Sequence, residues 1–353
     1  MFAVGDIYLN TRNSSHPFKH VCHILKEKDI LFGNLETVLS KNGTEKKKSV
    51  ILKSSPDFAK YLKDVDFDVL NVANNHAMDL GIEGLKCTIN SLDNYSLNYV
   101  GLVNSKNKQN SLILEKNGIK LGFLGYTIGR FKESDTLHLS KLVENHILLD
   151  IKFLQNKCDY IVISLHWGTE NVFYPSPAQI ELAHKLIDNG ATLILGHHPH
   201  VVQGIEKYKH GLIAYSLGNF QFVNKLPRYK TNESIILSVE LGKDGIVDYE
   251  IIPLLINKDF VPTLADKKEK ENILEWITQI SAPLLNRDIT DKWWFEEIGS
   301  EYLLGNMRSY VFRIKKYGIM PFLECCIWLV TPFCIKCYAG IVRRNISKVF
   351  NGE

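Results

Sequence analysis

The stretch Ala191-Thr-Leu-Ile-Leu-Gly-His-His-Pro-His200 decides the fold. Its first half, Ala191–Leu195, is a short apolar run of the kind found in buried strands of parallel sheets. Three histidines follow Gly196 within four positions. Ligand sites of α/β proteins lie beyond the carboxyl ends of such strands, and neutral imidazole is a common metal ligand. The stretch therefore predicts an α/β protein with a metal site where this strand ends at Gly196, on a loop that Pro199 stiffens.

The same arrangement, a buried strand followed by a polar side chain, recurs along the chain. Further strands are predicted at residues 2–9, 30–33, 68–73 and 160–165. The side chains at the strand ends are Asp6, Glu36, Asn75, His76, His166, His198 and His200. Because the carboxyl ends of parallel strands meet at one edge of a sheet, we expect these side chains to converge. Carboxylate, amide and imidazole ligands suit one or two divalent ions, of which Mn²⁺, Fe²⁺ and Zn²⁺ fit best.

Composition limits the class of protein. The chain has 353 residues, 45% of them hydrophobic and 23% charged, which is enough to bury a large core. A formal charge of +3 gives no reason to expect a nucleic-acid partner. The apolar run before Gly5 is too short for a secretory signal, so we expect a cytoplasmic protein. Seven scattered or clustered cysteines do not form a secreted disulfide framework.

A basic segment, residues 40–53, follows the second predicted strand and contains five lysines. Two interpretations stay open for it. The lysines are either solvated on a mobile loop, or some of them contact an anionic substrate.

Six motifs of this sequence resemble the CapA family of bacterial capsule and poly-γ-glutamate biosynthesis proteins, which belongs to the calcineurin-like metallophosphoesterase superfamily. They are Val4–Asp6, Asn34–Glu36, Ala73–Gly81, His166–Glu170, Gly196–Gln203 and Tyr215–Phe220. The resemblance implies a layered α/β/β/α sandwich and covers residues 2–255. We therefore expect a CapA-type domain over residues 1–255 and a helical C-terminal extension over residues 256–353.

The resemblance also assigns roles to the residues of these motifs. Six of them are implied metal ligands: Asp6 and His200 at the first ion, Glu36 between two ions, and Asn75, His166 and His198 at the second. Three are implied catalytic residues: His76, which protonates the leaving group, and Asp79 and Glu170, which orient histidines. We interpret His197 and Asn219 as ordinary structural residues. Tyr8 stands where related phosphoesterases carry a histidine, which predicts a weaker first metal site.

Two functions of different class follow from this resemblance. One is metal-assisted hydrolysis of a phosphoester or of an anionic polymer. The other is a non-catalytic component that binds the polymer or a synthase during capsule assembly. The expected partners are therefore an anionic polymer or phosphoester substrate and proteins of capsule synthesis or export.

The last hundred residues differ in character. Helices are predicted at 266–280 and 301–316, and an apolar segment at 318–342 follows between basic residues. This segment either packs against the main domain, lies on a membrane surface through residues 318–344, or spans the membrane. Its four cysteines, at 325, 326, 334 and 337, are more typical of a buried apolar helix than of a zinc site.

Overall fold

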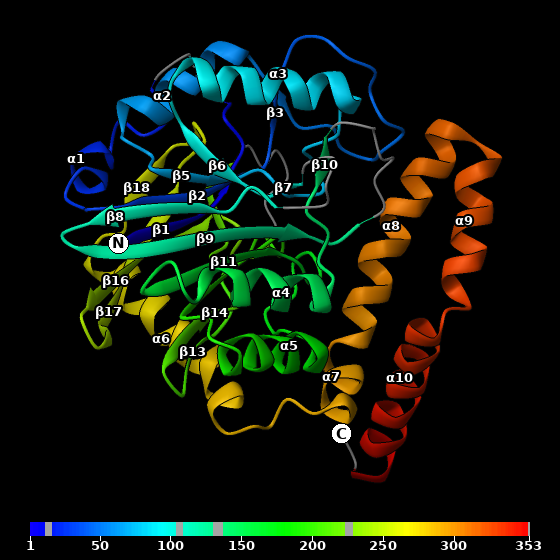
Figure 1. Cartoon of the computed structure of the whole chain (residues 1–353). Coiled ribbons are helices and arrows are strands. Elements are labelled where there is room, and N and C mark those ends of the chain that lie inside the picture. Colours follow the sequence, from blue (N-terminus) through cyan, green and yellow to red (C-terminus); the bar gives the residue numbers. More distant parts are fainter. Residues whose placement is uncertain (11–15, 104–108, 130–136, 223–228, 352–353) are drawn as a thin grey trace.

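The computed structural model describes residues 1–10, 16–103, 109–129, 137–222 and 229–351. Two large β-sheets lie face to face at its centre, and helices cover their outer faces (Figure 1). This arrangement confirms the predicted layered α/β/β/α sandwich with helices at the C-terminal end.

The first sheet contains the strands β1 (Phe2–Ile7), β2 (Leu31–Leu35), β5 (Val69–Asn71), β6 (Asn98–Val100), β15 (Asn219–Gln221), β16 (Glu233–Gly242), β17 (Gly245–Ile256) and β18 (Pro262–Leu264). Its order is β18-β17-β16-β1-β2-β5-β6, and β15 pairs with the end of β1. The strands β1, β2, β5 and β6 run parallel. Their carboxyl ends therefore meet at one edge of the sheet.

The second sheet contains β8 (Leu112–Lys116), β9 (Ile119–Thr127), β11 (Tyr160–His166), β12 (Leu193–His197), β13 (Ile205–Tyr208) and β14 (Gly211–Ala214). Its order is β13-β14-β12-β11-β9-β8, with β9, β11, β12 and β14 parallel. The strand β12 continues through His197, so the prediction that it ends at Gly196 is wrong. Its pairing with β11 places His166 opposite His197, which explains the one additional residue.

Two short strand pairs lie outside these sheets, namely β3 (Val38–Leu39) with β4 (Lys53–Ser54), and β7 (Leu102–Val103) with β10 (His138–Leu139). The helices are α1 (Cys22–Leu25), the 3₁₀ turn η1 (Pro56–Phe58), α2 (Ala59–Asp64), α3 (Gly81–Asn94), α4 (Glu144–Leu154), α5 (Pro177–Asp188), α6 (Lys267–Leu285), α7 (Asp291–Glu297), α8 (Gly299–Tyr317), α9 (Ile319–Leu329) and α10 (Pro332–Asn351).

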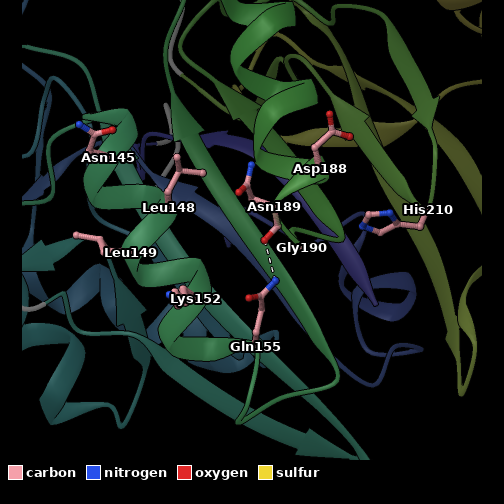
Figure 2. A pocket seen from close by; sticks show the side chains of 9 residues that line it. All are labelled: Asn145, Leu148, Leu149, Lys152, Gln155, Asp188, Asn189, Gly190 and His210. Atoms are coloured by element: carbon pink, nitrogen blue, oxygen red, sulfur yellow. Dashed lines mark hydrogen bonds between the residues drawn. The ribbon is translucent and has the colours of Figure 1, made fainter.

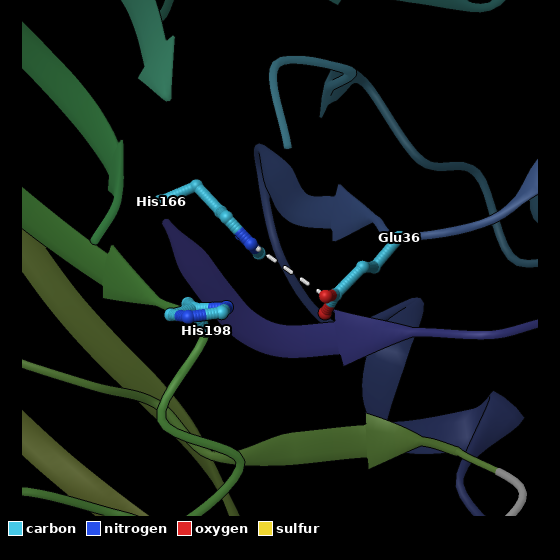
Figure 3. A group of neighbouring side chains, drawn as sticks. All are labelled: Glu36, His166 and His198. Carbon is cyan, nitrogen blue, oxygen red and sulfur yellow. Dashed lines mark ion pairs between the residues drawn. The ribbon is translucent and has the colours of Figure 1, made fainter. Parts of the chain in front are cut away.

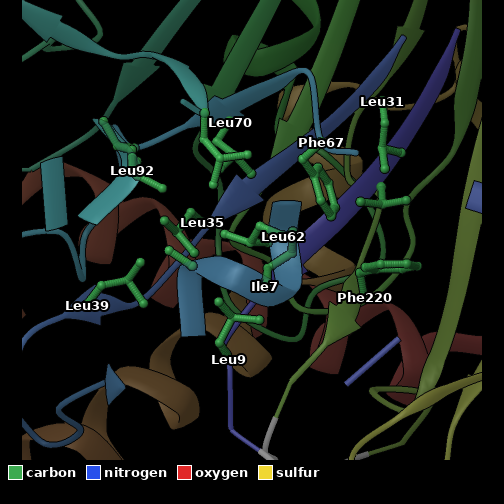
Figure 4. Close-up of a cluster of buried hydrophobic side chains, with 14 of the residues drawn as sticks. Ile7, Leu9, Leu31, Leu35, Leu39, Leu62, Phe67, Leu70, Leu92 and Phe220 are labelled. Carbon is green, nitrogen blue, oxygen red and sulfur yellow. The ribbon is translucent and has the colours of Figure 1, made fainter. Parts of the chain in front are cut away.

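Three apolar clusters hold the layers together. One fills the space between the sheets, with Phe32 of the first sheet stacked 6.2 Å from Phe123 of the second. Another joins the first sheet to α2 and α3 through side chains such as Leu62 and Leu92 (Figure 4). The third joins the second sheet to α4, α5 and α7 and includes Trp294. Burial of these side chains fixes both sheets, and with them the strand ends that carry the polar residues.

The helices α7 to α10, called here the C-terminal helices, stand along one side of the sandwich (Figure 1). Phe333 of α10 packs against Phe295 of α7 at a ring distance of 5.2 Å. The predicted apolar segment is divided into α9 and α10, whose axes differ by 62°. Among the described helices, none alone has the length and hydropathy to cross a membrane. Together, α9 and residues 332–347 have that length and hydropathy, but they form a bent pair.

Candidate metal centre

Asp6 lies at the carboxyl end of β1, buried beside the loop that follows β12. The amide of Asn34 donates to its Oδ1 over 2.8 Å, and the backbone N–H of His198 donates to its Oδ2 over 3.2 Å. The Nδ1 atoms of His197 and His200 each lie 3.3 Å from a carboxylate oxygen of Asp6. Burial opposes ionisation, but these two imidazoles lower the pKa of Asp6 well below its usual value. Asp6 is therefore a carboxylate, as a metal ligand requires.

Glu36 follows β2 and lies at the centre of the cluster. Both of its carboxylate oxygens are buried, and neither has a hydrogen-bond partner among the described residues. Three histidine Nε2 atoms surround Oε1, those of His166 at 3.5 Å, His200 at 3.9 Å and His76 at 4.0 Å. Burial and the negative charge of Asp6 raise the pKa of Glu36 well above its usual value. Such a buried, unsatisfied carboxylate is costly unless a cation accompanies it.

His166 and His198 lie close to Glu36, and Asn75 contacts His166. His166 Nε2 lies 3.0 Å from Asn75 Oδ1, and the rings of His166 and His198 are 4.8 Å apart (Figure 3). Burial lowers the pKa of His198 to about 4 and lowers that of His166 well below its usual range. Both imidazoles are therefore neutral near pH 7, which is the form that binds metals.

The loop after β12 has an unusual backbone. His198 and His200 both have positive φ angles, 97° and 59°, a region that favours glycine. Such strain at a non-glycine residue is typical of functional sites. The strand end before it also needs Gly196, since a Cβ there would lie 1.8 Å from the carbonyl oxygen of Tyr215.

Asn219 is the first residue of β15. Its Nδ2 donates to the carbonyl oxygens of His200 and Thr231, over 3.2 and 2.9 Å, which directs its Oδ1 toward His200 Nδ1 at 2.9 Å. Because both neighbours of that nitrogen are acceptors, Nδ1 carries the proton and Nε2 is directed toward Glu36. The interpretation of Asn219 as a plain structural residue is therefore wrong, because it orients a candidate ligand.

The residues fit a divalent cation. Three groups have ligand atoms that lie within 4.8 Å of one another: Glu36, His166 and His198; Asp6, Glu36 and His200; and Glu170, His198 and His200. Glu36 belongs to the first two groups. The ligand atoms are oxygens and nitrogens without sulfur, a set suited to hard or borderline ions. The cluster is therefore a candidate centre for one or two divalent ions.

His76 and Asp79 form a pair beside this centre. His76 Nδ1 lies 2.6 Å from Asp79 Oδ2, and because a carboxylate only accepts, Nδ1 carries the proton. Burial lowers the pKa of His76, and its other ring nitrogen, Nε2, lies 4.0 Å from Glu36 Oε1. Lys48 Nζ donates to Asp79 Oδ1 over 2.7 Å and to the carbonyl oxygen of Asn75 over 2.7 Å. Lys48 is therefore one lysine of the basic segment that reaches the site.

Two other predicted residues occupy the rim. Glu170 is exposed, with an oxygen close to the ligand nitrogens of His198 and His200. Tyr8 packs its ring against Phe222 at 5.7 Å, and Phe222 in turn lies 4.8 Å from the ring of His200.

Sequence reasoning missed an inner layer of polar residues. Asn34 Nδ2 contacts both Asp6 and His166, and its Oδ1 accepts from Asn71 Nδ2 over 3.0 Å. Asn74 donates to the carbonyl oxygen of Leu35 and accepts from the backbone N–H of His76. These buried amides hold the ends of β2 and β5 together. The signal was present as the Asn-Asn-His run, in which only the second asparagine was assigned a role.

A separate pocket of about 680 Å³ lies between the ends of α4 and α5, beside His210 (Figure 2). Gln155 donates to the carbonyl oxygen of Asn189 at its edge, over 2.8 Å. Its lining contains none of the candidate ligands. Its lining offers no group of convergent metal ligands.

Helices on both sides of two sheets, with carboxylates, imidazoles and an amide at the ends of the parallel strands, define an α/β sandwich protein with a candidate metal site. The chain belongs to the family of the bacterial capsule synthesis protein PGA_cap, whose model matches residues 1–224. It is similar to the capsule biosynthesis protein CapA of Bacillus anthracis, with 32% identity over 79% of this chain and 72% of the relative. It is also similar to the PGA biosynthesis protein CapA of Bacillus subtilis, with 32% identity over 79% of this chain and 77% of the relative.

Solved structures resemble the chain more distantly. A hypothetical protein from Thermus thermophilus shares 16% identity at a TM-score of 0.49, covering 71% of this chain and 97% of that one. A putative 5'-nucleotidase from Staphylococcus aureus shares 12% identity at a TM-score of 0.47, covering 79% and 57%. These likenesses are too weak to support a statement about activity.

Proposed function

We propose that this protein is a metal-dependent hydrolase of the phosphoesterase type that acts in capsule or poly-γ-glutamate biosynthesis. One observation carries the proposal: the buried carboxylate of Glu36 has no hydrogen-bond partner among the described residues and belongs to two overlapping groups of metal ligands. The biosynthetic context comes from the names of its relatives, both of which are CapA proteins.

The proposed ligands are Asp6 and His200 on one side of Glu36, and Asn75, His166 and His198 on the other. When bound there, a divalent ion would lower the pKa of a water molecule and offset negative charge on the group being transferred. Asn219 Oδ1 accepts a hydrogen bond from Nδ1 of His200, which leaves Nε2, on the side of Glu36, as the nitrogen that would bind the ion. Asn34 fixes the positions of Asp6 and His166 from behind.

His76 is the proposed acid for the leaving group. Asp79 accepts a hydrogen bond from Nδ1 of His76. Proton exchange with the substrate therefore occurs at Nε2, the nitrogen that faces Glu36. General acid catalysis of this kind contributes roughly 10²–10⁴-fold to the rate. Lys48, 30% exposed beside Asp79, places a positive charge where an anionic substrate enters.

The test is hydrolysis of bis(p-nitrophenyl) phosphate, a phosphomonoester and a γ-glutamyl peptide by the purified full chain, together with elemental analysis. We expect turnover of a phosphoester that chelator abolishes and metal restores, and loss of both metal and turnover in His166→Ala. His184→Ala is the matched control, because this partly buried histidine pairs with Glu206 away from the centre. Metal binding without turnover of any substrate would favour the non-catalytic binding role instead.

A further inference from the structure

The C-terminal helices expose an unusual amount of apolar side chain. On α9, Ile319, Met320, Phe322, Leu323 and Ile327 are between 47% and 69% exposed. This helix packs on α8 and α10 and lies on the far side of α8 from the sandwich (Figure 1). A contiguous exposed surface of this kind marks an interaction site.

The helix α10 continues the apolar surface as a stripe. Its exposed apolar residues Ile335, Tyr338, Val342, Ile346 and Val349 recur at steps of three and four, so they share one helix face. The opposite face of α10 is the one that packs inward, through Cys334, Cys337 and Gly340. The apolar side chains of the stripe are therefore exposed, and we call them, with the α9 residues, the outer apolar surface.

The positive charge of helices α8 to α10 indicates the chemistry of the partner. Residues 299–351 contain eight basic and two acidic residues, a net charge of +6, although the whole chain carries only +3. Glu324, the one acidic residue of α9, is paired with Arg313 of α8. Lys315 and Lys316 are exposed at the turn where α9 begins. An apolar surface bordered by positive charge is complementary to an anionic lipid surface.

We propose that the outer apolar surface docks on an anionic phospholipid bilayer, with Lys315 and Lys316 among the headgroups. An anionic bilayer fits better than a second copy of the chain, because two copies would bring together two regions of charge +6. The outer apolar surface contains none of the candidate metal ligands. The inference does not depend on hydrolysis.

The experiment is flotation of the purified full chain with vesicles of phosphatidylcholine and phosphatidylglycerol at low salt, compared with phosphatidylcholine alone. We expect binding to the anionic vesicles only. Ile319→Asp/Ile327→Asp and Val342→Asp/Ile346→Asp should each weaken it by about tenfold or more, since they place charge on the inserted face. Lys315→Gln/Lys316→Gln should weaken it by roughly 25-fold, about fivefold for each lysine.

Val247→Asp is the matched control, because Val247 is 60% exposed on β17, away from these helices. This variant should bind vesicles like the unaltered chain. The thermal transition of each variant is measured to show that it folds. Failure of the folded full chain to bind anionic vesicles overturns the proposal. Equal vesicle binding by all variants also overturns it. A change from dimer to monomer in the aspartate variants without loss of vesicle binding overturns it as well, because that result would identify a second copy of the chain as the partner.

Discussion

Replacing Glu36 by glutamine should have opposite effects on the metal-free and the metal-loaded protein. In the metal-free protein both carboxylate oxygens are buried without a partner among the described residues, and burial raises the pKa of Glu36. Burying an unpaired polar group costs about 1–3 kcal/mol, and more when it is charged. Glu36→Gln removes the charge at nearly constant volume. We therefore expect it to increase the free energy of unfolding of the chelator-treated protein by about 1–3 kcal/mol at pH 7.

The pH dependence of this stabilisation follows from the raised pKa of Glu36. A carboxyl group whose pKa is raised by folding destabilises the protein as the pH rises through its ordinary value of 4.5. The advantage of the glutamine variant should therefore shrink as the pH falls from neutrality toward that value.

A bound metal ion should reverse the order of stability of the unaltered chain and Glu36→Gln. A divalent ion at 100 times its dissociation constant stabilises the native state by about 2.7 kcal/mol. Loss of the shared ligand should weaken binding tenfold or more, which removes at least about 1.4 kcal/mol of that stabilisation.

The assay is urea unfolding, followed by tryptophan fluorescence, with chelator and with Mn²⁺. Glu206→Gln is the control, because this buried carboxylate is satisfied by His184 at 3.0 Å and by the hydroxyl of Tyr215 at 2.8 Å. It should destabilise the protein by about 1–2 kcal/mol and leave the response to metal unchanged. If Glu36→Gln destabilises the metal-free protein, or if metal stabilises both proteins equally, Glu36 is not an unsatisfied metal ligand.

Three further outcomes are expected. His76→Asn should lower kcat for phosphoester hydrolysis by roughly 10²–10⁴-fold with unchanged metal content, and simultaneous loss of metal would show instead that His76 is a ligand. Lys48→Met should raise KM for an anionic substrate more than it lowers kcat, whereas an equal fall in kcat would show that Lys48 acts mainly by holding Asp79. Gly196→Ala should destabilise the protein by about 3 kcal/mol in urea unfolding, because its Cβ would lie 1.8 Å from the carbonyl oxygen of Tyr215, and a normal unfolding curve would contradict that geometry.

Much of the site could be predicted because it depends on local patterns. Buried strands are short apolar runs, and the residue that follows each run lies at the carboxyl edge of a parallel sheet. For that reason Asp6, Glu36, His166 and His198 could be placed together before any contact was known. The ring distance of 4.8 Å between His166 and His198 agrees with that expectation.

The contacts of His197 and Asn219 could not be predicted from the sequence, because they depend on the register between distant strands. His197 pairs with His166 across β11 and β12, and its ring is fully buried against Asp6. Asn219 pairs with Asp6 across β15 and β1, which brings its amide to His200. A histidine or an asparagine beside a glycine is common in ordinary turns, so neither residue stands out in the sequence itself.

The contact between the C-terminal helices and the basic segment gives that part of the chain a role in the site. The family match ends at residue 224, yet Tyr317 of α8 donates to the carbonyl oxygen of Lys48 over 3.0 Å. Ser309 of the same helix lies 3.4 Å from the hydroxyl of Ser49. The helix thus holds the backbone of the lysine that pairs with Asp79, and Asp79 orients His76. A surface lysine in a polar loop would ordinarily be solvated, and it is the packing of α8, more than 250 residues away in the sequence, that directs this one into the site.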